Sequence, residues 1–265
     1  MGPFGMPLGS SLVRGNGQMH RLTFDPQYNG TTNRTIYGAT SNGGLWRTED
    51  DGENWNVVNT DHQLPFTNVS GIAVDYNNSN NLFICTGMSD AGIEYLYTPN
   101  SGDVNPIFTT GIYRSTNYGE TWEPINDNFL LNFINGGTTR KIMTHPQNSD
   151  KVYVLTSYGI FISNNALSLN PTWVQPQIQP TLPPANLPDE FLRGLEFKPG
   201  NPDVMYSSGQ DIYQSTDGGN TWISITGTNT GLDFSSIPFL NNIGITVERI
   251  NLAVPLPTPT GCTLT

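Results

Sequence analysis

Hydroxyl, carboxylate or carboxamide, glycine and tryptophan side chains recur at one fixed spacing in three stretches of the chain. The stretches read GLWRTEDDGENW (44–55), GIYRSTNYGETW (111–122) and DIYQSTDGGNTW (211–222). The residues that share these positions are Thr48, Asp50, Gly52 and Trp55; Ser115, Asn117, Gly119 and Trp122; and Ser215, Asp217, Gly219 and Trp222. Short polar side chains accept hydrogen bonds from turn amides, hydroxyls bond within the same loop, and glycine allows a positive φ. The spacing therefore predicts a tight turn between two strands, with the indole ring buried beneath it.

The first stretch also carries a cluster of carboxylates, which is one way to hold a calcium ion. The cluster consists of Glu49, Asp50, Asp51 and Glu53. Because this spacing fits no standard calcium loop, a solvated turn is the favoured interpretation. The histidines His20, His62 and His145 are far apart in the sequence and form no ligand spacing. We predict neither a metal nor a cofactor.

The three stretches belong to a larger repeat, in which each tryptophan follows three further strand-like runs. In the last full unit these runs are LRGLEFKPGNP (192–202), DVMYSSG (203–209) and the start of the 211–222 stretch. A third unit, ending at Trp173, has the same order but an expanded turn that lacks the Asp and Gly. Four strands in a repeat of roughly 50 residues match a β-propeller blade better than a β-sandwich or a β-helix. We therefore expect an all-β fold with four-stranded antiparallel blades.

The blade boundaries follow from the repeats. We assign residues 1–17 to a lead-in segment, 18–257 to the propeller (blades at 18–58, 69–126, 140–176 and 192–225, and a partial blade at 247–257) and 258–265 to a tail. Four blades and the start of a fifth would leave strand edges exposed. The expectation is that further blades of a longer chain, or a partner, complete the ring.

Composition narrows the classes of partner. The net charge is −11, only 12% of residues are charged, and the Lys and Arg residues are spread along the chain. A phosphate-tracking surface needs clustered cations, so nucleic-acid binding is not expected. No apolar run approaches the length of a membrane span, and residues 1–17 do not form an intact signal peptide. Cys85, in the apolar run LFICTG, is expected to be a small buried side chain, whereas the pairing of Cys262 is left open.

The repeated turn resembles the Asp box, or BNR repeat, S/T-x-D-x-G-x-T-W. This motif is found in sialidases, xyloglucanase-type glycoside hydrolases, sortilin-like propellers and photosystem assembly propellers, where it is a folding element remote from the site. GNGQMHRLTFDP and GATSNGGLWRTEDDGENW are most similar to the opening of sortilin-like propellers from bacteria with type IX secretion. That resemblance implies a secreted or cell-surface protein whose signal peptide lies outside this chain.

The resemblance to hydrolases can be examined residue by residue. Sialidases have a first arginine in an R-I-P phrase, which is missing here. In xyloglucanase-type enzymes a phrase similar to T-D-x-G-G carries a catalytic Asp, but the matching stretch here is Thr40-Ser41-Asn42-Gly43-Gly44, in which the acid is missing. Neither the hydroxyl of Ser41 nor the carboxamide of Asn42 can replace a carboxylate acid or base. We therefore expect a non-catalytic binding or structural module, with a propeller-type glycoside hydrolase or a protein assembly factor as alternatives.

One long loop is the candidate binding element. The segment 88–110, between the second and third strands of the second unit, is the longest insertion of its kind. Its carboxylates and aromatic rings, Asp90, Glu94, Tyr95 and Tyr97, would suit a carbohydrate or a peptide. A decorated loop without a ligand is the alternative.

Overall fold

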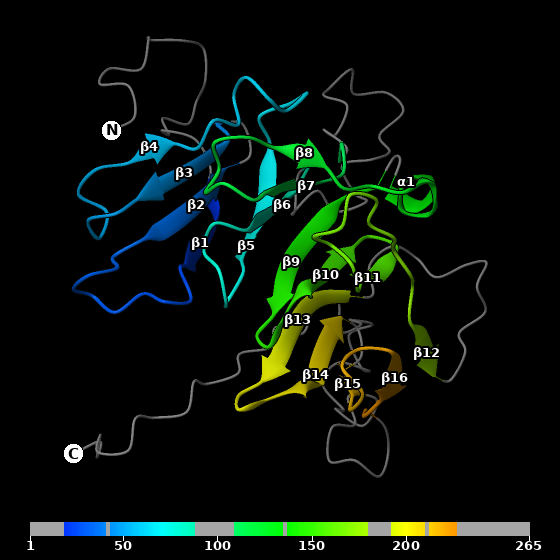
Figure 1. Cartoon of the computed structure of the whole chain (residues 1–265). Helices are drawn as coiled ribbons and strands as arrows, with labels where there is room; N and C mark the ends of the chain where they lie inside the picture. Colours follow the sequence, from blue (N-terminus) through cyan, green and yellow to red (C-terminus); the bar gives the residue numbers. More distant parts are fainter. Residues whose placement is uncertain are drawn as a thin grey trace, which may run out of the picture.

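The computed structural model describes residues 19–40, 43–87, 109–134, 137–179, 192–209 and 212–226, and these form a β-propeller arc with one short helix (Figure 1). The first blade contains β1 (Met19–Phe24), β2 (Ile36–Thr40), β3 (Leu45–Thr48) and β4 (Asn56–Val57). The second contains β5 (Val69–Val74), β6 (Leu82–Thr86), β7 (Ile112–Ser115) and β8 (Glu123–Pro124). Both are antiparallel sheets in which strand order follows chain order. The expected fold class is confirmed.

The third and fourth blades depart from the expected four strands. The third has β9 (Thr139–His145), β10 (Asn148–Thr156) and β11 (Gly159–Ser163), and its fourth strand is reduced to one bridge between Ile162 and Val174. Pro171 and Pro176 flank this bridge, and prolines cannot donate to a strand ladder. Helix α1 (Asn128–Ile134) precedes the blade.

The fourth blade gains a strand. It contains β13 (Leu192–Lys198), β14 (Asn201–Gly209), β15 (Ile212–Ser215) and β16 (Thr221–Ser224). In addition, β12 (Gln177–Gln179) pairs parallel to β16 at the outer edge. Gln177–Gln179 of the connection from the third blade therefore extend the sheet of the following blade.

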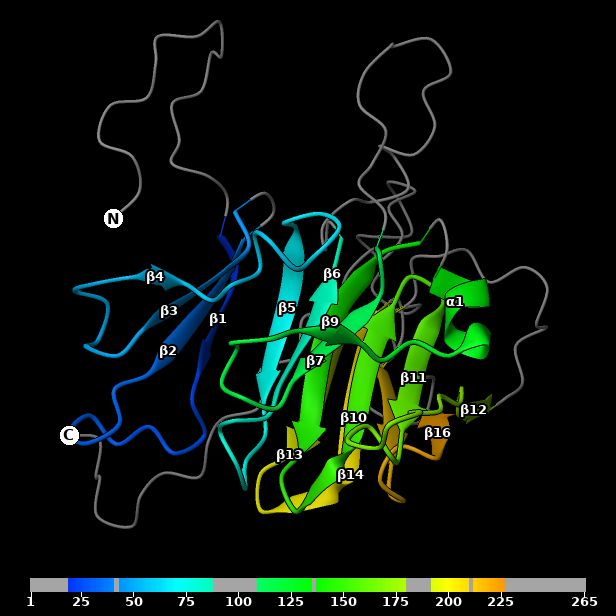
Figure 2. The same cartoon turned by 45° about the horizontal axis from the view of Figure 1, so that its top comes forward.

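Successive blades pack face to face and enclose three apolar cores, one between each neighbouring pair. The blades follow one another in chain order, from blue to orange in Figure 2. Every residue of β5 and β6 is buried because the second blade is covered on both faces. This explains the continuous apolar runs in these strands. In a sheet with one solvent-exposed face, apolar and polar residues would alternate. Cys85 is fully buried here, as expected.

The first strand of each blade contacts the first strand of the next, so β1, β5, β9 and β13 form the inner wall of the arc. Each of these strands has a register shift near its beginning, for example between Met19 and Arg21 in β1. The residues that follow the shift are Arg21, Gly71, Lys141 and Gly194. They occupy equivalent positions in the four blades.

Candidate functional site

The repeated turns are built from the same hydrogen bonds. In the first blade, the Thr48 hydroxyl donates to Asp50 Oδ1 at 2.7 Å, and the Gly52 amide donates to Thr48 Oγ1 at 2.8 Å. The Asn54 amide donates to Asp50 Oδ1 at 2.9 Å. These hydrogen bonds, with that from the Asn54 amide the largest cause, lower the pKa of Asp50 to about 2. The carboxylate is therefore bound to its own turn.

The second and fourth blades repeat this geometry. Ser115 and Ser215 each donate to the next polar residue, Asn117 or Asp217, at 2.8 Å. The amides of Gly119 and Gly219 each donate back to the serine hydroxyl at 2.9 Å, and their φ angles are 88° and 90°. Burial favours the neutral form of Asp217, but hydrogen bonds from Thr221 and Ser215 outweigh it and lower the pKa.

The third blade preserves more of this turn than its sequence indicated. The Ser163 hydroxyl donates to Asn165 Oδ1 at 3.2 Å, and the Thr172 amide donates to the same oxygen at 2.9 Å. Asn165 Oδ1 therefore accepts the hydrogen bonds that the Asp accepts in the other turns, here across a longer loop. The S-N-N triplet in GIFISNN, aligned with S-T-N in GIYRSTN, was the signal that could have identified it.

The tryptophans do more than fill the space beneath their own turns. Trp122, Trp173 and Trp222 each join the core shared with the preceding blade. The indole of Trp122 donates to the carbonyl of Val58 at 3.0 Å, and that of Trp173 to Ile125 at 2.7 Å. Trp55, in the first blade, belongs to none of these cores and is only half-buried. None of the twelve turn residues lines the inner hollow described next.

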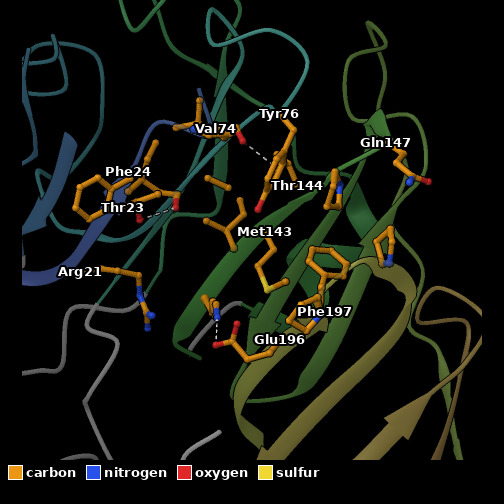
Figure 3. A pocket seen from close by; sticks show the side chains of 18 of the residues that line it. Arg21, Thr23, Phe24, Val74, Tyr76, Met143, Thr144, Gln147, Glu196 and Phe197 are labelled. Carbon is orange, nitrogen blue, oxygen red and sulfur yellow. Dashed lines mark hydrogen bonds and ion pairs between the residues drawn. The ribbon is translucent and has the colours of Figure 1, made fainter. Parts of the chain in front are cut away.

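A hollow of about 580 Å³ runs along the inner wall (Figure 3). All four first strands line it, together with the turns that follow them. Tyr76, Met143 and Phe197 reach into this space from three different blades (Figure 3). Tyr76 is 45% exposed, and Phe24 and Leu22, on the first blade's side, are 55% and 56% exposed. We call this feature the inner hollow.

The inner wall is cationic although the chain is acidic. The four first strands carry five of the 11 Lys and Arg residues (Arg21, Arg140, Lys141, Arg193 and Lys198) and one of the 22 Asp and Glu residues, Glu196. Apart from the adjacent Arg140 and Lys141, these cations are separated in the sequence and come together only because the first strands are neighbours. The spread of Lys and Arg along the chain did not predict this cluster. Their recurrence near the beginning of equivalent strands was the available signal.

An ion pair lies inside the inner hollow. Lys141 Nζ is 2.5 Å from Glu196 Oε1, and the side chains are 15% and 34% exposed. Burial lowers the pKa of Lys141 and the charge of Arg21 lowers it further, whereas Glu196 raises it. Burial and the nearby Glu196 carboxylate raise the pKa of Tyr76. Arg21, Lys141, Glu196 and Tyr76 therefore form one electrostatically connected group.

The turns that close the first strands have a structural role. The Gln27 amide donates to Asp25 Oδ1 at 2.8 Å, and the Gln147 amide donates to His145 Nδ1 at 3.1 Å. Among the described residues, no group of three or more His, Cys, Asp or Glu side chains is placed to hold a metal. Within the same ranges, no helix is long and apolar enough to cross a membrane.

Several residues from the sequence analysis lie outside the described ranges. They are Asn42, Asp90, Glu94, Tyr95, Tyr97 and Cys262, together with the lead-in 1–17, the partial blade 247–257 and the tail 258–265. Their roles and boundaries stay predictions.

No protein-family model matches the chain. A curated relative, xyloglucanase Xgh74A of Acetivibrio thermocellus, is 27% identical over 232 residues, which cover 77% of this chain and 26% of the relative. The crystal structure of an ancestral GH74 enzyme matches with a TM-score of 0.50 at 18% identity, over 81% of this chain and 25% of that one. The chain thus spans about a quarter of the length of these proteins. The structural likeness supports the β-propeller fold.

Proposed function

We propose that this chain is a non-catalytic binding module of the propeller type and that the inner hollow binds a carbohydrate. The observation that carries the proposal is the convergence of aromatic and charged side chains from four blades on one space of about 580 Å³. Such a volume is typical of a small-ligand site, and exposed aromatic faces can pack against sugar rings. Export to the cell surface or medium remains a prediction from the resemblance to secreted propellers.

The chemistry of Glu196 favours binding over hydrolysis. Glycoside hydrolysis requires two carboxyl groups, usually one protonated acid and one base or nucleophile. Glu196 is the carboxylate in the described lining of the inner hollow, and it is ion-paired with Lys141. The pair occupies Glu196 Oε1, an oxygen atom that catalysis would need.

A propeller-type glycoside hydrolase is the second candidate. The relative supports it, because 77% of this chain aligns with an enzyme named xyloglucanase. A hydrolase would need a second carboxyl group besides Glu196, from outside the described lining of the inner hollow.

A glycan-array screen with a parallel hydrolysis assay, on the full 265-residue chain, separates these candidates. We expect binding without turnover, and loss of about tenfold in affinity for Tyr76→Ala or Phe24→Ala, two exposed rings of the lining, since one lost stacking contact is worth about 1 kcal/mol or more. Phe66→Ala is the matched control, because Phe66 is 57% exposed and lies outside the inner hollow. Turnover would favour the hydrolase. A folded sample that binds no glycan would exclude the carbohydrate proposal and direct attention to a protein partner.

A further inference from the structure

Positive charge is concentrated on the inner wall, although the molecule as a whole is acidic. Of the cations on the strands of this wall, Arg21, Lys141 and Lys198 line the inner hollow, and Glu196 is the carboxylate of that lining, whereas the whole chain has a net charge of −11. Concave surfaces lined by one sign of charge concentrate ligands of the opposite sign. The equivalent positions in the second and fourth blades hold Gly71 and Gly194, so Arg21 and Lys141 place this charge asymmetrically along the wall.

Arg21 has hydrogen-bonding capacity that the protein does not use. Its Nη2 donates to the carbonyl of Arg140 at 3.3 Å, a long hydrogen bond. Its Nε is buried and has no hydrogen-bond partner among the described residues. A guanidinium holds its N–H donors in a planar fork that matches a carboxylate, so the terminal nitrogens of Arg21, Nη1 and Nη2, are suited to a bidentate anionic partner.

The lining of the inner hollow has more cations than carboxylates. Glu196 forms its ion pair with Lys141, and Arg21 lines the same space. Lys198 adds a further cation at the end of β13, where the lining of the inner hollow continues into the next turn. An anionic group in this space would balance the excess of positive charge in the lining.

The aromatic side chains restrict the kind of anion. Tyr76 and Phe197 line the same space as Arg21 and Lys141 (Figure 3). Aromatic faces beside cationic donors suit a ligand with both a ring face and a negative charge, and a small inorganic anion would leave the aromatic surface unused.

We propose that the inner hollow selects an acidic oligosaccharide whose sugar rings carry carboxylates, with Arg21 and Lys141 binding the carboxylates and Tyr76 and Phe197 packing on the rings. This specificity rests on the proposed function and concerns the same site. It assigns Arg21 a binding role, and it makes Glu196 an internal competitor that holds Lys141 when no ligand is bound.

The test uses isothermal titration calorimetry on the full chain with trigalacturonic acid and with its methyl ester, which has nearly the same shape but no charge. We expect the acid to bind about tenfold or more tightly than the ester at low salt, and this preference to shrink as salt is added. If the ester binds as tightly as the acid, the charge specificity is wrong while the carbohydrate proposal survives. If neither ligand binds but the chain binds a neutral glycan on the array, only the proposed charge specificity is overturned. If no glycan on the array binds either, the carbohydrate proposal is overturned as well.

Two variants test the roles proposed for Arg21 and Glu196. Arg21→Gln should weaken binding of the acid about tenfold, and Glu196→Gln should strengthen it several-fold by releasing Lys141. Arg34→Gln is the control, because Arg34 is an exposed cation paired with Asp51 outside the inner hollow. The gain in affinity expected for Glu196→Gln tests the proposal even if the Arg21→Gln variant does not fold. A loss of affinity in Glu196→Gln would overturn the proposal, as would tighter binding of an acidic tripeptide or of a sulfated trisaccharide than of trigalacturonic acid.

Discussion

Each blade contributes a hydrogen-bonded turn, such as those of Asp50, Asn117 and Asp217, and a first strand on the inner wall. The turn residues are alike in all blades, whereas the inner-strand residues differ from blade to blade. At the turns, every blade supplies a hydroxyl, a short polar acceptor and a tryptophan, and the third blade keeps them across an insertion. At the inner strands, the position after the register shift changes from Arg21 to Gly71 to Lys141 to Gly194. Uniform residues satisfy a demand that every blade shares, which is stability. Residues that differ between blades can make one asymmetric site.

Replacing Trp122 by alanine should have the largest effect, and it tests whether the uniform turn residues stabilise the fold. The variant removes a ring that is 8% exposed and a hydrogen bond to Val58 in the preceding blade. We expect the free energy of unfolding to fall by about 3–5 kcal/mol, measured by urea denaturation. Trp55→Ala is the control and should lose less, about 1–2 kcal/mol, because Trp55 is half-buried and joins no core between blades. Equal losses would show that the tryptophans serve only their own turns.

The glycine of the same turn should have the next largest effect. At Gly119 the φ angle is 88°, and an added Cβ would lie 2.1 Å from Cγ1 of the core residue Val58. Gly119→Ala should therefore lower the free energy of unfolding by about 2 kcal/mol or more. Gly200→Ala separates backbone strain from the clash, because its φ is 78° and nothing lies within 4 Å of the added Cβ. We expect about 1 kcal/mol for this control, and similar losses in both would contradict a role for contact between blades.

Acid should reveal the smallest effect. The pKa of Asp50 is lowered from 3.8 to about 2 in the folded chain, so its ionised form stabilises the fold fully above the unfolded pKa. This contribution is lost as the pH falls from about 4 to 2. Asp50→Asn, which copies the natural Asn117, should be less stable than the wild-type chain at pH 7, and the difference should disappear towards pH 2. Urea midpoints at several pH values measure this, and a constant difference would show that the carboxylate charge is irrelevant.

Local patterns were enough to predict the blades and most of their turns. Alternating or continuous β-branched and aromatic runs identified nearly every strand, and the turn motif identified three hydrogen-bonded loops. The prediction failed where a local pattern was interrupted, at the fourth strand of the third blade and at β12. Pro171 and Pro176, on either side of Val174, decided the first case, and pairing with a strand more than 40 residues away decided the second.

The sequence by itself determined the all-β repeat, because hydrogen bonds within a turn and the two-residue period of a strand involve neighbours along the chain. Only the tertiary structure decided that Trp122 and Trp173 enter the preceding blade and that the cations of distant strands share one wall. Arg21 and Arg140 illustrate the reason, since their hydrogen bond joins residues 119 positions apart. Their meeting depends on how whole sheets stack, and that stacking follows from the cores buried between blades.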